Sequence, residues 1–181
     1  MAQRQDPSAW RAEDMKTNAA WLTVLEDGHV AEILAAVEAS EALDEPIHAI
    51  SRQSFLLPTL GPVLERLRRD IVAGAGFCLI RGLPLAGRSR EQIMRAYFGV
   101  GAYVGTARPQ NREGHLIGHV KDLGEDKNDP ATRIYRTNGR QRFHVDSCDI
   151  VGLLCLQPAK TGGASSICSS VAIAQEIERQ R

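Results

Sequence analysis

The chain has 181 residues, of which 43% are hydrophobic and 24% charged, and 22 basic side chains balance 22 acidic ones. This length and composition are typical of one globular domain with a core of its own. A formal net charge of zero predicts no general attraction to nucleic acid or to a membrane surface. No apolar run is long enough to span a bilayer and no signal core follows the N-terminus, so we expect a cytoplasmic protein.

Helical periodicity dominates the first half of the sequence. Apolar residues recur at helical spacing over Val30–Val37, Leu60–Ile71 and Ile93–Val100. We expect Asp27 to cap the first helix, and the capping-box pattern of Ser89–Gln92 to open the third. These patterns predict a helical N-terminal layer.

The second half changes to short apolar runs that are separated by glycines and polar turns. Asn138–Gly139 favours a hairpin turn, because both residues tolerate positive φ. Ile150–Leu156 is almost continuously apolar, as in a strand that is buried on both faces. Val171–Arg181 then predicts a terminal helix. With one run from the first half, the predicted strands are residues 77–80, 115–120, 132–137, 140–146, 149–157 and 164–169.

These elements predict a single α+β domain over residues 1–181, helical at 1–105 and β-rich at 106–181. We expect the strands to be antiparallel and to form a sandwich or a barrel. The cysteines lack the paired spacing of a structural zinc site, and we interpret them as free thiols. They are Cys78, Cys148, Cys155 and Cys168.

The pattern that carries chemistry is Phe-His-Val-Asp, with His144 and Asp146 two residues apart. In an extended strand such residues point to the same side, so both side chains can face one ion. An imidazole with a carboxylate suits Fe(II), Mn(II) or Zn(II). The alternative is a structural histidine that is satisfied by local hydrogen bonds.

A second pattern follows after one further predicted strand. It is Thr-Gly-Gly-Ala-Ser, which contains Gly162, Gly163 and Ser165. The order of the two motifs resembles the TauD/TfdA family of Fe(II)- and 2-oxoglutarate-dependent dioxygenases. Upstream, Gly76–Gly82 looks like the strand of that family that leads into an Arg-Gly turn. The likeness covers roughly residues 60–181.

The resemblance implies a fold, cofactors and residue roles. The fold would be a double-stranded β-helix, or jelly roll. Fe(II) would be held by His144, Asp146 and a later histidine, and the hydroxyl of Ser165 would contact the carboxylate of 2-oxoglutarate. Gln110 and Asn111 would touch a small organic substrate, which is hydroxylated with O2 while 2-oxoglutarate is decarboxylated to succinate.

The chain departs from the family pattern in two respects. Ala164 stands where the family usually has an acidic residue. The second metal-binding histidine and the arginine for 2-oxoglutarate lie later in the family, and no histidine follows Asp146 here. The remaining residues leave room for about two of the strands that a complete barrel still needs. We therefore expect the N-terminal portion of a longer dioxygenase.

Other interpretations remain open. The chain could be a catalytically inactive fragment or pseudoenzyme that acts as a binding or interaction module, and an exposed β edge could pair with a second copy. A zinc hydrolase would need further ligands. The amides of Gln110 and Asn111 could instead cap a turn. Four arginines around the predicted hairpin could attract an anionic substrate or form a solvated tip: Arg133, Arg136, Arg140 and Arg142.

Overall fold

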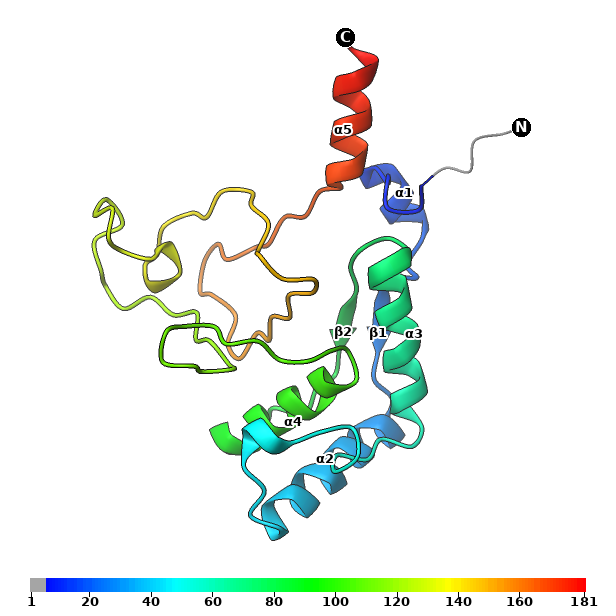
Figure 1. Ribbon diagram of the computed structural model, residues 1–181, viewed down its shortest axis with the longest axis vertical. Coiled ribbons are helices and arrows are strands. Elements are labelled where there is room, and N and C mark those ends of the chain that lie inside the picture. The colour runs from blue at the N-terminus through cyan, green and yellow to red at the C-terminus, as the bar shows by residue number, and fades with distance from the viewer. Residues whose placement is uncertain (1–5) are drawn as a thin grey trace. The chain divides into compact units, whose positions relative to one another are not determined.

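The computed structural model describes residues 6–181 (Figure 1). They divide into two compact units, which are described separately: the larger runs to Thr106 and resumes at Gly152–Arg181, and the smaller is Ala107–Val151. The helices and strands of the described residues are α1 Ala12–Thr17, β1 Leu22–Val24, α2 Asp27–Ala42, η1 Ile47–Ala49, α3 Leu60–Ala73, β2 Leu79–Arg81, α4 Arg90–Ala102, η2 Ile134–Arg136 and α5 Ser170–Arg179.

The three predicted helices of the first half are confirmed as α2, α3 and α4. Ser89 caps α4 as predicted, because its side chain accepts a hydrogen bond from the backbone N–H of Gln92. The prediction for Asp27 is wrong by one residue, since Glu26 is the N-cap of α2 and Asp27 is its first helical residue. α2 ends before Pro46, and Asp44 then turns the chain with a φ of 49°.

The N-terminus of α3 is anchored by α2. The carboxylate of Glu32 accepts hydrogen bonds from the backbone N–H groups of Thr59 and Leu60, at 2.9 and 3.0 Å, and from the Thr59 hydroxyl. Partial burial would raise the pKa of Glu32, but these hydrogen bonds outweigh it and lower the pKa below its ordinary value. The carboxylate thereby satisfies helix N–H groups that have no partner within α3.

The hydrophobic core lies in the larger unit, between the helices. Phe55, Ile33, Leu60 and Leu64 are fully buried, and Tyr103 fixes the loop before α3 by donating to the carbonyl of Phe55. The buried members of this core are Leu25, Ile33, Ala36, Val37, Ile50, Phe55, Leu57, Leu60, Leu64, Leu67, Ala96 and Tyr103. All of them precede residue 107, so the helical layer supplies its own core.

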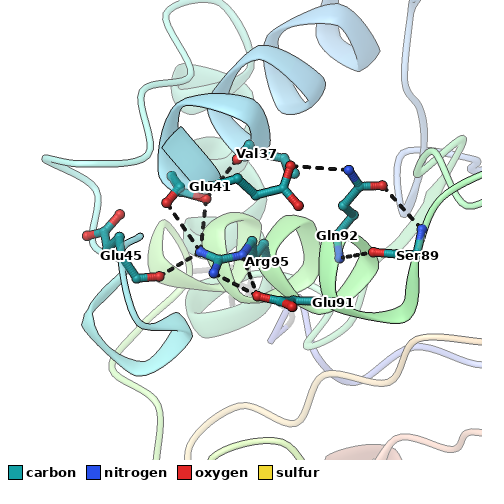
Figure 2. Close-up of polar contacts among 8 residues, drawn as sticks. Val37, Glu41, Glu45, Ser89, Glu91, Gln92 and Arg95 are labelled. Carbon is teal, nitrogen blue, oxygen red and sulfur yellow. Dashed lines mark hydrogen bonds and ion pairs between the residues drawn. The ribbon is translucent and has the colours of Figure 1, made fainter. Parts of the chain in front are cut away.

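One charged side chain is buried in this layer. Arg95 of α4 is only 5% exposed, and Figure 2 shows its guanidinium between α2 and the loop that follows it. Its Nη1 donates to the Glu45 carbonyl at 2.6 Å and to the Ser40 hydroxyl at 3.3 Å, and its Nη2 pairs with Glu91 at 2.8 Å. Arg95 therefore joins α4 to the C-terminal end of α2 through polar contacts.

A two-stranded parallel sheet lies at one side of the core. β1 and β2 pair with Leu22 opposite Leu79 and Val24 opposite Arg81. The strand predicted at residues 77–80 is thus present but shifted, and β1 was not predicted. Trp10 holds the N-terminal segment against this region through a hydrogen bond from its indole N–H to the Ala75 carbonyl at 2.7 Å.

The antiparallel strands predicted for the second half are not formed in residues 107–169. Ile150–Leu156, predicted to be buried on both faces, is irregular, with Leu153 77% exposed. Strands need partners for their backbone groups and an apolar layer to cover their side chains. No backbone–backbone hydrogen bond is made by residues 140–168 within the described part of the chain.

The smaller unit is held by short-range polar contacts. Asn138–Gly139 does not form the predicted hairpin; η2 precedes it, and the Thr137 hydroxyl accepts from the Gly139 N–H. The backbone N–H of Leu123 donates to the carbonyl of Arg136, whose side chain pairs with Glu125. This unit therefore contains no strand in the range 107–151.

The terminal helix is confirmed as α5. Ser169 caps it by accepting from the N–H of Ala172. Glu176 accepts hydrogen bonds from Arg179, Gln180 and Arg11, which lower its pKa to about 2. No helix in residues 6–181 is long and apolar enough to cross a membrane.

Candidate functional site

His144 and Asp146 approach each other in the smaller unit. The distance from Nε2 of His144 to Oδ1 of Asp146 is 3.8 Å, and the two side chains are 48% and 52% exposed. They lie in an irregular segment rather than in the predicted strand. The two polar groups lie near each other although the strand on which the prediction rested is not formed, and their role as metal ligands stays a prediction.

The imidazole of His144 is held in a defined orientation by its own segment. Its Nδ1 lies 2.8 Å from the backbone carbonyl of Arg142. A carbonyl oxygen only accepts hydrogen bonds, so Nδ1 carries a proton in this contact, and in the neutral tautomer with this proton Nε2 bears the lone pair. A backbone carbonyl at the distal nitrogen is a common way to orient a metal-binding histidine. The side-chain amide nitrogen of Gln141 lies 3.1 Å from Nε2.

The two groups fit one divalent ion as part of its ligand set. Nitrogen and oxygen ligands bind such ions at about 2.1 Å, so two ligands of one ion lie at most about 4.2 Å apart. The 3.8 Å between Nε2 of His144 and Oδ1 of Asp146 is within that limit. No group of three or more His, Cys, Asp or Glu side chains in residues 6–181 is arranged to hold a metal. His144 and Asp146 therefore stay predicted ligands, and the described residues offer no third one beside them.

Gln110 and Asn111, the predicted substrate residues, form a local turn with His115. The Asn111 side-chain oxygen accepts from the His115 N–H at 3.0 Å, and its amide nitrogen lies 2.7 Å from Nδ1 of the same histidine. The amide nitrogen of Gln110 donates to the carbonyl of Arg108. Both amides are therefore engaged within the turn, the arrangement of the turn-capping alternative, and their substrate role stays a prediction.

Ser165, the predicted 2-oxoglutarate contact, belongs to the larger unit. It is exposed, and its hydroxyl makes no hydrogen bond within the described part of the chain. Gly162 and Gly163 before it have φ values of 72° and 74°, which favour glycine. A Cβ on Gly163 would also lie 2.8 Å from that of Ala159. The backbone conformation therefore explains why glycine stands at positions 162 and 163. The hydroxyl of Ser165 is exposed and can contact a ligand.

The four arginines near Asn138–Gly139 are all exposed. Arg136 pairs with Glu125 at 3.2 Å, while Arg142 contributes its backbone carbonyl, rather than its charge, to the histidine. Sequence reasoning did not predict this carbonyl or Gln141. The signal that could have found them is their position, two and three residues before His144.

A surface hollow of about 260 Å³ lies elsewhere, in the larger unit. Trp10, Phe77 and Cys168 contribute to its wall, and it contains none of the predicted site residues. The hydroxyl of Ser169, which also lines it, is already engaged in capping α5. The hollow therefore lacks the convergent free polar groups of a ligand site.

The comparison of the sequence with known families confirms the resemblance that the motifs indicate. The family described as "Taurine catabolism dioxygenase TauD, TfdA family" matches residues 40–181. The chain belongs to this family. The match begins within α2 and includes both the His144–Asp146 pair and the Gly-Gly motif.

Two curated relatives resemble the chain over most of its length. FR-33289 synthase of Streptomyces rubellomurinus (strain ATCC 31215) is 30% identical over 167 residues, which are 92% of this chain and 49% of that protein. Taurine hydroxylase-like protein SAT17 of Stachybotrys chartarum (strain CBS 109288 / IBT 7711) is 29% identical over 183 residues, covering 97% of this chain and 48% of that protein. The chain spans about half the length of these relatives.

Proposed function

We propose that this chain is the N-terminal portion of a non-haem Fe(II)- and 2-oxoglutarate-dependent dioxygenase that hydroxylates a small organic substrate. The observation that carries the proposal is the convergence of His144 Nε2 and Asp146 Oδ1 at 3.8 Å, in a chain that belongs to the TauD/TfdA family. An imidazole and a carboxylate with positions left open are the ligand types of non-haem Fe(II) oxygenases.

The residues of the chain have distinct roles in this proposal. When bound, Fe(II) with 2-oxoglutarate and O2 supplies the oxidising chemistry. His144 presents Nε2, and the Arg142 carbonyl fixes its ring by holding Nδ1. Asp146 supplies a carboxylate oxygen as a second ligand and a negative charge that attracts the cation. Ser165 donates its hydroxyl to the carboxylate of 2-oxoglutarate.

Substrate positioning is assigned to Gln110 and Asn111. Their amides are engaged in a local turn, so a substrate with polar groups would exchange these hydrogen bonds for its own. One relative is named a taurine hydroxylase-like protein and the other a synthase, so the names alone do not define one substrate. We propose a small, polar, organic substrate.

We further propose that the active enzyme needs polypeptide in addition to these 181 residues. The jelly roll of the family requires strands that residues 107–169 do not form by themselves. Phe143 and Val145, which flank the metal residues, are 66% and 88% exposed, as are other apolar side chains of this region. The relatives are about twice as long as this chain, which is enough for additional strands. Such strands would cover these apolar side chains and would carry the remaining metal-binding histidine.

Metal titration of the 181-residue chain tests the site. We expect weak one-to-one binding of Mn(II), followed by electron paramagnetic resonance, and at least a tenfold loss on Asp146→Asn. Asp149→Asn is the matched control, because Asp149 is also exposed and lies in the same segment. Equal binding by wild type and Asp146→Asn would refute the site.

The alternative function is that of a binding or interaction module. The exposure of apolar side chains such as Leu153 and Ile167 favours it, since such surface commonly marks an interface. A module of this kind would self-associate or capture a protein without binding metal. Sedimentation velocity over a concentration series, run beside the Mn(II) titration, separates the two functions. Self-association without Mn(II) binding would favour the module.

A further inference from the structure

Gln141 contacts the metal-binding face of His144. Its side-chain amide nitrogen lies 3.1 Å from Nε2, the ring nitrogen that bears the lone pair in the neutral tautomer with its proton on Nδ1. An amide N–H is a donor and an imidazole lone pair is an acceptor, so the contact is a hydrogen bond from Gln141 to His144. The donor therefore occupies the same lone pair that a metal ion would use.

The neighbouring contacts make this arrangement specific. Both ring nitrogens of His144 have a partner of the matching type: Nδ1 faces an acceptor and Nε2 faces a donor. Oδ1 of Asp146 lies 3.8 Å from Nε2 as well. Gln141 and Asp146 thus both lie near Nε2 of His144, the nitrogen that the proposed metal site would use.

We propose that Gln141 is a placeholder residue of the metal site. Its amide holds the imidazole in the metal-ready tautomer when the ion is absent, and a divalent cation must displace it to reach Nε2. The inference rests on the proposed function, because it assigns a role at the same site. It adds a residue that lowers the affinity of that site for cations.

The proposed role of Gln141 predicts the direction in which its replacement changes the metal affinity. Every cation that binds must break the hydrogen bond from Gln141, which lowers the apparent affinity. One neutral hydrogen bond corresponds to about a two- to tenfold change in an equilibrium constant. Gln141→Leu keeps the size of the side chain and removes the donor. Its Mn(II) affinity should therefore rise by about two- to tenfold, as measured on the 181-residue chain.

A second variant tests the position of the side chain. Gln141→Glu replaces the amide by a carboxylate, which is itself a ligand of divalent cations. If residue 141 lies at the ion, affinity should rise by about tenfold or more. Asn138→Asp adds the same charge to an exposed residue of the same segment and should change affinity by less than about twofold.

The outcomes separate the inference from the function on which it rests. Nitrogen-15 spectra of the wild-type ring should show His144 protonated at Nδ1 before metal is added. Mn(II) binding that is unchanged or weakened in Gln141→Leu would overturn the placeholder and leave the metal site intact. A chain that binds no Mn(II), as wild type or as either variant, would overturn the proposed function as well.

Discussion

Replacing Arg95 by methionine should strongly destabilise the helical layer. Methionine retains most of the buried stem but removes every donor of the guanidinium. The Glu45 carbonyl and the Ser40 hydroxyl then lose their donor in a region where Arg95 is only 5% exposed. A buried polar group without a partner costs about 1–3 kcal/mol. We expect a loss of about 2–3 kcal/mol in the free energy of unfolding.

The ion pair with Glu91 is a much smaller part of this effect. The side chain of Glu91 is 61% exposed, and such pairs contribute about 0.3–0.5 kcal/mol. Glu91→Gln is therefore the matched control. Urea unfolding followed by circular dichroism should show a midpoint lowered by about 1–2 M for Arg95→Met and almost unchanged for Glu91→Gln. Similar midpoints for both variants would refute the assignment of the stability to the carbonyl and hydroxyl contacts.

Three further predictions concern the fold. A Cβ on Gly99 would lie 2.5 Å from the Phe55 ring, so Gly99→Ala should lower the free energy of unfolding by about 1–3 kcal/mol in the same urea assay. Gly101 has open space around it, so Gly101→Ala should raise that free energy by up to about 1 kcal/mol. The lowered pKa of Glu32 stabilises the fold fully above its unperturbed value of 4.5, and this contribution is lost as the pH falls through the folded value; Glu32→Gln should flatten the acid side of the stability–pH curve. Backbone amides of residues 140–151 should exchange with deuterium far faster than those of α3, and strong protection there would contradict the irregular structure.

The helical layer could be predicted from the sequence because its signals are local. The apolar spacing of Leu60, Leu64 and Leu67 places them on one face of α3, and all three are buried. The Ser89–Gln92 capping box needs only four consecutive residues, and it forms as predicted. Such features depend on contacts within one or two turns of helix, so the sequence contains nearly all the information for them.

The strands that were predicted for the second half are not formed, because strand formation does not depend on local signals alone. An apolar run such as Ile150–Leu156 becomes a strand only if another segment pairs with its backbone, and that partner need not be near in sequence. β1 illustrates the converse. Leu22–Val24 shows no strong strand pattern, yet it pairs with Leu79–Arg81, which lies more than fifty residues away. Strand formation is decided by the partner rather than by the run itself.

The candidate site combines both kinds of information. His144 and Asp146 lie 3.8 Å apart although the predicted strand is not formed. The two residues are close in sequence, and the Arg142 carbonyl in the same short segment orients the imidazole. A third protein ligand has no such local source, and within residues 6–181 no third His, Cys, Asp or Glu joins the pair. A short motif can therefore bring two polar side chains together by itself, whereas on the proposed function the third ligand would come with the strands that cover Phe143 and Val145. We therefore expect high-affinity metal binding only under conditions in which residues 107–169 also form strands.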